Sequence, residues 1–493
     1  MEFKLTTAFF LRSLSLALIL AAAGLTFWQW NQFQNLPGGL PQGSTLGGVP
    51  VGGLDPEQAS ERLLQAYQAP VELHYAGAAI QVDPQRLGFH LDLDAMLAQV
   101  RSAGRPKDLG AFWDYLFNQL EYAPVAIPLE AGVDADQVRT YLESEIVPRY
   151  DQPPTPAIPL PARPELQPGQ PGETLQVDAS IQPIQEALRS LSERTVDLPL
   201  QNVDSLPPLP EHLQIQLEQI LDTSDFGGLA EIYLKDLQTG RTIHFARMNG
   251  ADVPTEIAFT AASTMKVPIM LSVLKRTAEP TPDWILELME GMIVRSENPP
   301  ADSLMEQVID PVSGPLDVTA DMQALGLQNT FIAGYFYLGA PLLQLYDTPA
   351  NTRTDINLQP DVYNQTTPGE IGRVLEDIYQ CAESSSGELI STFSGQISSD
   401  ECKLVISYLL RNKTALLLEA GVPEGTPIAH KHGWIEEADG LLHTMSDVAI
   451  IYTPGGNYVL NVFLYHPVQL VFDPANIMIA QISQAVYNFF NYN

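Results

Sequence analysis

The stretch AFTAASTMKVPIMLSVLKR, residues 258–276, places Ser263 and Lys266 where a loop enters an apolar helix. Residues three apart lie on one face of a helix, so the lysine ammonium can approach the serine hydroxyl. Backbone N–H groups at the helix start add positive potential where an oxyanion would form. Pro268 is tolerated only near a helix beginning, which supports this placement. The pair suits a serine nucleophile with a neighbouring proton acceptor, but alone it fits a capping serine beside a solvated lysine better.

Two further segments carry polar residues that suit chemistry around Ser263, and a third has a structural pattern. The motif Ser-Glu-Asn at residues 296–298 lies at a break between two helical stretches. The motif Lys-His-Gly at residues 431–433 lies on the first of two predicted strands joined by a turn, where the lysine supplies a point charge for a carboxylate. The segment NQTTP at residues 364–368 leads into a helix. The order of these motifs along one chain gives them more force than each has alone.

Taken in order, the four segments resemble those of the class A β-lactamase and penicillin-binding family, over about residues 210–493. The resemblance implies a multi-domain α+β chain in which an antiparallel sheet flanked by helices forms a serine hydrolase domain. Carried over position by position, the site consists of the catalytic residues Ser263, Lys266 and Ser296, an oxyanion hole made by the backbone N–H groups of Ser263 and Trp434, and the substrate-binding residues Asn298, Lys431, His432 and Gly433.

The resemblance also implies a mechanism. Ser263 attacks a carbonyl and forms an acyl-enzyme, Lys266 takes the proton, and Ser296 relays it to the leaving group. Asn298 and Lys431 position the substrate, which is a β-lactam or a peptidoglycan-like amide. Within enzymes the alternative is a DD-peptidase or esterase using the same site. The alternative of another class is a non-catalytic peptidoglycan-binding protein, against which the intact motifs argue.

Two departures from the family pattern concern the shape of the site. The interval from Ser263 to Ser296 is shorter than in typical class A enzymes, which predicts a more open cleft. His432 replaces the usual threonine or serine and so removes a hydroxyl that helps to bind a carboxylate. The histidine either donates a hydrogen bond in its place, with a charge that varies near neutral pH, or points away from the site.

A third departure concerns the deacylation step. No glutamate occurs between Glu306 and Glu370, the interval in which class A enzymes carry the glutamate that activates water. Asp347, Asp355 and Asp361 are the conceivable substitutes, although aspartate in such a setting is more often a turn residue. Without a placed base the acyl-enzyme is expected to persist, and efficient β-lactam hydrolysis is not expected.

The N-terminal segment has the pattern of an export signal. Residues 13–30 are almost entirely apolar and follow Lys4 and Arg12. The run is near the ~20 residues that a bilayer core requires, and the tryptophans at its far end suit the headgroup region. An uncleaved anchor with an extracytoplasmic ectodomain is favoured over a cleaved signal peptide and a secreted protein.

The region between this leader and the hydrolase domain resembles peptidoglycan-binding repeats that often precede cell-wall enzymes. The pieces that carry the resemblance are VGGLDPEQA (51–59), LGFHLDLD (87–94) and PGETLQVD (171–178). A generic spacer fits equally well, so binding to the cell wall stays open. The predicted organisation is a cytoplasmic N-terminus at 1–12, a membrane anchor at 13–30, a linker at 31–46, an α+β unit at 47–150, a related unit at 151–205, a Pro-rich linker at 206–212 and the hydrolase domain at 213–493.

Composition narrows the classes of partner. A formal net charge of −34 argues against a nucleic-acid partner. Cys381 and Cys402 are the only cysteines, and in an oxidising compartment they are expected to form a disulfide, the alternative being two buried thiols. Neither a Cys/His metal spacing nor a phosphate-binding glycine loop occurs, so no cofactor or metal is implied. His430 and His432 lack an evident third ligand.

Overall fold

The computed structural model describes residues 2–36, 39–103, 107–117, 123–224, 226–437 and 439–492. Contacts divide the chain into two compact units, one of residues 1–154 and 171–204, the other of residues 155–170 and 205–493. This grouping differs from the predicted boundaries at 150 and 205. The reason lies in α8 (Pro210–Thr223), where Gln216 Nε2 donates to the carbonyls of Arg163 and Glu165 at 2.8 and 3.0 Å and so ties residues 155–170 to the second unit.

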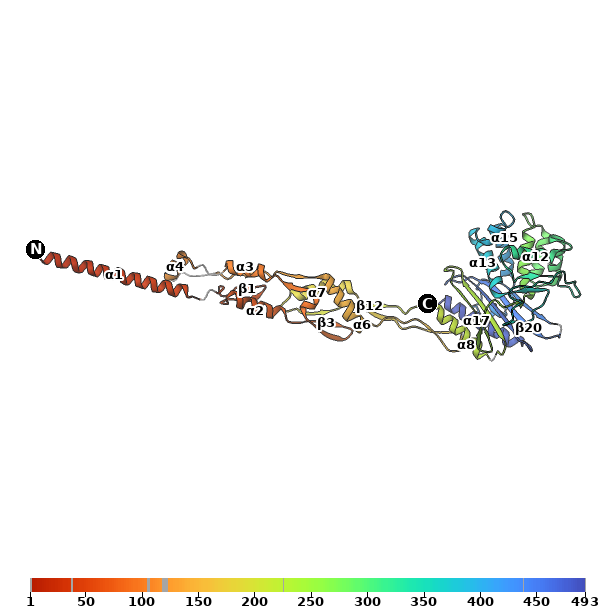
Figure 1. Cartoon of the computed structure of the whole chain (residues 1–493), viewed down its shortest axis with the longest axis horizontal. Helices are drawn as coiled ribbons and strands as arrows, with labels where there is room; N and C mark the ends of the chain where they lie inside the picture. Colours follow the sequence, from red (N-terminus) through yellow and green to blue (C-terminus); the bar gives the residue numbers. More distant parts are fainter. Residues whose placement is uncertain are drawn as a thin grey trace. The chain divides into compact units, whose positions relative to one another are not determined.

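The first helix, α1 (Glu2–Gln34), is longer than the apolar run in the sequence (Figure 1). Residues 9–34 of this helix are long and apolar enough to cross a membrane. Near its C-terminal end, Trp30 packs edge-on against Phe112 of α4 (Leu109–Leu116), with ring centroids 4.9 Å apart. This tryptophan therefore contacts protein as well as standing at the end of the apolar stretch.

The rest of the first unit is a small α+β structure. Asp55 caps α2 through a hydrogen bond from the Gln58 N–H at 2.8 Å, with Pro56 at the first helical position. Strand β11 pairs in parallel with β3, so segments on both sides of residue 150 share one sheet. The elements are β1 (Thr45–Leu46), β2 (Val49–Pro50), α2 (Pro56–Tyr67), β3 (Val71–Tyr75), β4 (Ala78–Val82), β5 (Phe89–Leu91), α3 (Leu93–Ala103), α4, β6 (Ala126–Ile127), β7 (Ala131–Val133), α5 (Ala135–Tyr141), α6 (Val147–Tyr150), β10 (Gly172–Leu175), α7 (Val177–Arg189), β11 (Thr195–Asp197) and β12 (Leu200–Val203).

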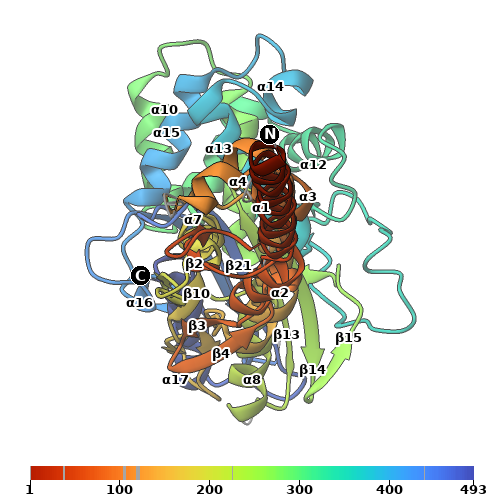
Figure 2. The same cartoon turned by 90° about the vertical axis from the view of Figure 1, so that its left-hand side faces the viewer.

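The second unit is built on a six-stranded antiparallel sheet, in the order β15-β14-β13-β21-β20-β19. Figure 2 shows β13, β14 and β15 side by side. The predicted α+β class, with an antiparallel sheet flanked by helices, is confirmed. The strands are β13 (Leu229–Asp236), β14 (Thr242–Met248), β15 (Ala251–Val253), β19 (Ile428–Glu436), β20 (Leu442–Ile451) and β21 (Tyr458–Tyr465), and short β8 (Ile158–Pro159), β9 (Leu166–Gln167), β16 (Phe259–Thr260), β17 (Phe331–Ile332) and β18 (Asn364–Thr366) lie outside this sheet.

Both faces of this sheet are buried, because successive side chains of a strand point to opposite faces. In β20, Val448 and Ile450 pack into the core beneath α9, α10, α13 and α15, while Ala449 and Ile451 pack into the core beneath α8 and α17. The two helical groups are seen in Figure 1. The helices not yet bounded are α9 (Lys266–Leu274), α10 (Asp283–Ile293), α11 (Asn298–Leu304), α12 (Gly314–Ala324), α13 (Pro368–Ser384), α14 (Glu388–Thr392), α15 (Ser399–Leu410), α16 (Leu417–Ala420) and α17 (Phe472–Phe490).

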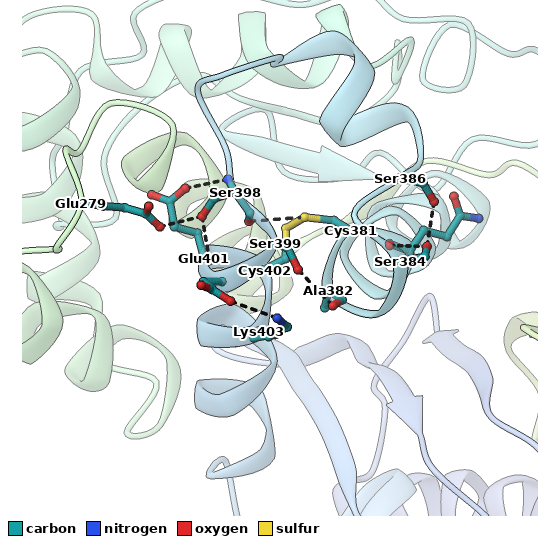
Figure 3. Close-up of a disulfide and its surroundings, with 12 residues drawn as sticks. Glu279, Cys381, Ala382, Ser384, Ser386, Ser398, Ser399, Glu401, Cys402 and Lys403 are labelled. Atoms are coloured by element: carbon teal, nitrogen blue, oxygen red, sulfur yellow. Dashed lines mark hydrogen bonds and ion pairs between the residues drawn. A yellow bond between two sulfur atoms is a disulfide. The ribbon is translucent and has the colours of Figure 1, made fainter.

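The predicted disulfide is confirmed. Cys381 of α13 and Cys402 of α15 are bonded, with their Cα atoms 6.0 Å apart and both side chains buried (Figure 3). Ser399 Oγ donates to the Ala382 carbonyl at 3.1 Å beside the bridge. The bridge joins two helices that pack into the same core as α9, and so it supports the helical face of the unit.

Candidate active site

The segment around Ser263 forms a tight turn that leads into a buried helix. Residues 262–265 make one turn of 3₁₀-helix and α9 follows directly at Lys266. Ala262, the residue before the nucleophile candidate, has a φ of 49°. A non-glycine residue held in this left-handed region costs energy, and such positions cluster at active sites. The fold thus imposes a conformation on the Ser263 turn that local preference disfavours.

Lys266 is fully buried and makes three hydrogen bonds through its Nζ atom. It donates to Ser263 Oγ at 3.0 Å, to the Ser296 carbonyl at 2.7 Å and to Asn298 Oδ1 at 2.8 Å. Burial lowers the pKa of Lys266 to about 8, although the charges of Asp302 and Glu297 oppose this shift. A lysine with such a pKa has an appreciable neutral fraction near physiological pH and can accept a proton.

Ser296 stands between the two lysines of the site. Its carbonyl binds Lys266, and its Oγ accepts a hydrogen bond from Lys431 Nζ at 2.8 Å. Ser296 also has a positive φ, 58°, at the break between α10 and α11. This is the second strained residue of the site. The bend in its backbone lets its carbonyl accept from Lys266 while its Oγ accepts from Lys431.

Lys431 lies on β19, the edge strand of the sheet, and is completely buried. Besides Ser296 Oγ, its Nζ donates to the His432 carbonyl at 3.2 Å. Burial lowers the pKa of Lys431 well below its ordinary value, and the charge on Lys266 lowers it further. The structure therefore brings Ser263, Lys266, Ser296 and Lys431, from three separate stretches of sequence, into one continuous chain of contacts.

Gly433 marks the place where β19 runs close to the Ser263 turn. A Cβ atom at this position would lie 2.9 Å from the Ala261 carbonyl oxygen, 2.9 Å from Ser446 Oγ and 3.0 Å from Thr264 Cγ2. Only glycine allows this approach without a shift of the strand. The close contact places the backbone of residues 433–434 beside Ser263, which is what the predicted oxyanion hole of Ser263 and Trp434 requires. The donation of these two N–H groups stays a prediction.

His432 does not behave as a titrating group. The residue is 9% exposed, and its ring stacks on Trp434 with centroids 4.3 Å apart. Burial, followed by the charge on Lys431, lowers the pKa of His432 to about 2. The expectation that its charge varies near neutral pH is therefore wrong, because protonation would bury a third positive charge beside two lysines. Its Nδ1 atom is buried and has no hydrogen-bond partner among the described residues.

The three aspartates that could substitute for the missing glutamate lie elsewhere. Asp355 forms an ion pair with Arg353 at 2.7 Å. Asp361 caps a turn by accepting from the Tyr363 N–H at 3.0 Å, and burial raises its pKa. Within the described parts of the chain, neither of these carboxylates nor that of Asp347 hydrogen bonds with Ser263 or Lys266. The contact of Asp361 supports its interpretation as a turn residue.

A fourth carboxylate, which the motifs did not predict, does act on Lys266. Asp302 follows Asn298 by four residues on α11 and raises the pKa of Lys266 more than Glu297 does. The i,i+4 spacing puts Asn298 and Asp302 on one face of the helix, so this spacing was an available signal. The spacing alone could not show the importance of Asp302, because the neighbouring sequence does not reveal that this face of α11 turns toward α9.

The histidine pair also has a structural explanation. His430 is buried; its Nδ1 atom lies 3.1 Å from both carboxylate oxygens of Asp447, and its Nε2 atom lies 2.6 Å from the Asn412 carbonyl oxygen. His430 therefore has partners for both ring nitrogens inside the fold. No cluster of three or more His, Cys, Asp or Glu side chains suited to a metal ion occurs in the described ranges.

Comparisons with known proteins gave one family match and several similar solved structures. A model of the β-lactamase enzyme family matches residues 281–490, which include Ser296 and Lys431 but begin after Ser263 and Lys266. Among solved structures, a mutant of PBP-A in an acyl-enzyme complex with penicillin G is similar at 21% identity, covering 58% of this chain and 98% of that chain with a TM-score of 0.41.

Two further solved structures give similar values. The class A β-lactamase of the last common ancestor of Gram-negative bacteria is 21% identical and covers 56% of this chain and 97% of its own, with a TM-score of 0.40. A β-lactamase from Xanthomonas campestris is 18% identical and covers 55% of this chain and 98% of its own, also with a TM-score of 0.40. No curated protein matches the chain.

Proposed function

We propose that the β-lactamase-like domain of this chain is a serine hydrolase that forms an acyl-enzyme on Ser263 with β-lactam or peptidoglycan-like amide substrates. The observation that carries the proposal is the chain of contacts from Ser263 Oγ to Lys266 Nζ, from Lys266 to Ser296, and from Ser296 Oγ to Lys431 Nζ. A serine hydroxyl is a weak nucleophile until a neighbouring base takes its proton. The lowered pKa of Lys266 makes it that base.

The side chains gathered around Ser263 suffice for the acylation step. Ser263 Oγ forms a bond to the carbonyl carbon while its proton passes to neutral Lys266. The C–N bond then breaks, and the leaving nitrogen takes a proton from Ser296 Oγ. In the proposed step Lys266 then gives the proton that it took to Ser296 Oγ, so that Ser296 and Lys266 are both restored and one proton has moved from Ser263 to the nitrogen overall. Lys431, held beside Ser296, would supply a positive charge to a substrate carboxylate in its ammonium form, which an arriving carboxylate favours.

Deacylation is proposed to be slow. Hydrolysis of an acyl-enzyme needs a base that activates water on the ester, and the aspartates Asp355 and Asp361 have other partners. A DD-peptidase or esterase reaction uses the same Ser263 and Lys266 and differs in the leaving group and in the fate of the acyl group. An acyl-enzyme that persists after reaction with penicillin therefore argues against efficient β-lactam hydrolysis and is compatible with a DD-peptidase or esterase.

The proposal is tested by incubating the full chain in detergent with benzylpenicillin and measuring the intact mass. We expect one acyl group per chain, on the peptide that contains Ser263, and we expect it to remain after free penicillin is removed. A chromogenic cephalosporin should turn over at less than about 1 s⁻¹, the low end of enzyme rates. Ser263→Ala is the control and should gain no mass.

Two results would count against the proposal. If wild type and Ser263→Ala gain the same mass, penicillin reacts at another residue. If no mass is gained by either, the site does not recognise penicillins. Rapid cephalosporin turnover would contradict slow deacylation alone, while leaving the role of Ser263 in place.

We further propose that α1 is a membrane anchor and that the two units lie on the extracytoplasmic side. The length and apolar character of residues 9–34 and the disulfide in the second unit support this location. Full-length protein should sediment with membranes after a carbonate wash, and a chain lacking residues 2–34 should not. Release of the full-length protein by carbonate would contradict an anchor. Whether the first unit binds cell-wall glycan stays a prediction.

A further inference from the structure

Asp302 connects the helix that carries Asn298 with an irregular segment that passes over Lys266. Its Oδ1 atom accepts a hydrogen bond from the Phe336 backbone N–H at 2.7 Å. The Phe336 ring lies over Lys266, with its centroid 5.4 Å from Nζ. The same carboxylate thus touches the backbone of residue 336, whose side chain covers the proposed base.

We propose that Asp302 is a positioning residue that holds residues 335–337 over Lys266 and supplies the main negative charge facing its ammonium group. The inference deepens the proposed function and rests on it for the role of Lys266. Asp302 itself does not touch Ser263 and acts through the lysine and through the segment. It belongs to none of the Ser-x-x-Lys, Ser-Glu-Asn and Lys-His-Gly motifs.

Residues 335–337 lie in a stretch held by few polar contacts, although Tyr335 and Phe336 also pack against the hydrophobic core. Between β17 and β18 the chain has no regular secondary structure, and Tyr337 and Leu338 are exposed. One end is fixed where Glu370 accepts hydrogen bonds from the Asn329 N–H, and the far side of the loop is fixed where Tyr363 donates to the Ala340 carbonyl. Between these points, the Phe336 N–H is bound by Asp302 of α11, and the Ala333 N–H is bound by the Tyr363 carbonyl.

The segment also forms one wall of a cavity next to the site. The cavity has a volume of about 540 Å³ and lies between α11 and the segment, where it is lined by Asn298, Asp302, Glu306, Tyr335, Tyr337 and Pro341, among others. Asn298 uses its Oδ1 atom to bind Lys266. Movement of the segment would therefore change both the cover over Lys266 and the wall opposite Asn298, where a substrate would lie.

The charge of Asp302 acts in a defined surrounding. Four groups contact Lys266: Ser263, the Ser296 carbonyl, Asn298 and the Phe336 ring. Four more interact with it through charge: Glu297, Asp302, Lys431 and His432. Of these, Asp302 and Glu297 are the anions, and Asp302 has the larger effect on the pKa of Lys266. Burial raises the pKa of Asp302 itself, while the N–H groups of Phe336 and Tyr337 and the Lys266 charge favour its carboxylate form.

Two variants of Asp302 separate its two roles, the hydrogen bond that it accepts from the Phe336 N–H and its negative charge near Lys266. Asp302→Ala removes both, so backbone hydrogen exchange at residues 335–337 should become about tenfold faster, the effect of losing a hydrogen bond to a charged group. Asp302→Asn keeps an oxygen acceptor for the Phe336 N–H and removes the charge. Exchange should then stay near the wild-type rate, while the midpoint of the rise of penicillin acylation with pH should move down by about one pH unit.

The direction of this pH shift follows from linkage. Acylation needs neutral Lys266, so in the wild type the rate rises with pH through the lysine pKa of about 8. A nearby anion favours the ammonium form, and removing it lowers the pKa and moves the rise to lower pH. Asp400→Asn is the control, because it removes a carboxylate that is exposed on α15, outside the cavity, and that does not act on Lys266. It should change neither readout.

The outcomes distinguish this inference from the proposed function. If hydrogen exchange at residues 335–337 is unchanged in Asp302→Ala, Asp302 does not hold this segment. If the pH midpoint of acylation is unchanged in Asp302→Asn, the charge of Asp302 does not act on Lys266. If wild type is not acylated by penicillin, the pH dependence of Lys266 acetylation by acetic anhydride replaces the acylation readout, and an unchanged midpoint there would refute the charge effect in the same way. If Asp302→Ala does not fold, the wild-type protection of the Phe336 amide decides, since an unprotected amide would show that Asp302 does not hold this segment.

Discussion

Replacing Lys266 by methionine is expected to lower the second-order rate constant of Ser263 acylation by penicillin about 10²–10⁴-fold, the range that a positioned general base contributes. Lys266 Nζ is the group that binds Ser263 Oγ, at 3.0 Å. Its removal leaves the hydroxyl without a proton acceptor, and it also frees the Ser296 carbonyl and Asn298 Oδ1 that the ammonium now connects. The rate constant is obtained by stopping the reaction with penicillin at set times and measuring the acylated fraction of the protein by intact mass.

The loss should come from chemistry and not from unfolding. Methionine is apolar, similar in length and suited to a buried position, whereas the ammonium is held in the fold against the cost of desolvation. The thermal midpoint of Lys266→Met should therefore be no lower than that of the wild type by more than a few degrees. Lys403→Met is the control, because Lys403 is exposed on α15 and pairs only with exposed Asp400 among the described residues. A rate for Lys266→Met within threefold of the control would remove Lys266 from the mechanism.

Replacing Gly433 by alanine is expected to lower the acylation rate constant about 100-fold while leaving the domain folded. The new Cβ atom would lie 2.9 Å from the Ala261 carbonyl oxygen and from Ser446 Oγ, so β19 and the Ser263 turn must separate by some tenths of an ångström or more. A misplacement of about 1 Å in groups that hold a reacting atom can cost about 100-fold in rate. It would also move the Trp434 N–H that is predicted to bind the oxyanion, and loss of one such donor costs about 10²–10³-fold.

Gly227→Ala is the matched control for this change. An added Cβ atom there would have no neighbour nearer than 3.8 Å, so the substitution tests glycine loss in the same unit without a steric conflict. The control should acylate at the wild-type rate. If Gly433→Ala also does so, the strand does not need its close approach to the Ser263 turn, and the oxyanion hole of Ser263 and Trp434 would have to be abandoned.

Much of the site was visible in the sequence because its parts are local motifs. The Ser263 turn precedes an apolar helix, the Ser-Glu-Asn motif breaks two helices, and the Lys-His-Gly motif lies on a strand, and each of these placements follows from patterns a few residues long. The disulfide was predicted because the chain has two cysteines and because its export signal indicates an oxidising compartment. Such features depend on residues near one another along the chain, so the sequence alone determined them.

The sequence could not predict which groups face one another across the fold. His432 carries the pattern of a titratable substrate ligand, yet burial beside Lys431 and stacking on Trp434 hold it neutral. Asp361 and Asp355 lie in the expected interval but serve a turn and an ion pair. The domain boundary near residue 150 also depends on remote contacts, because residues 155–170 pack on α8.

The amino-acid sequence by itself determined which residues are available for acyl chemistry and on what kind of element each one lies, since helix starts, strand alternation and turns are set by neighbouring residues. Only the tertiary structure decided that Ser296 contacts both lysines, that Gly433 lies against Ala261, and that Asp302 faces Lys266. These contacts join residues separated by tens to more than a hundred positions. Long-range packing of the sheet against α9 and α11, and the loss of water that accompanies it, sets their distances and the lowered pKa values of both lysines.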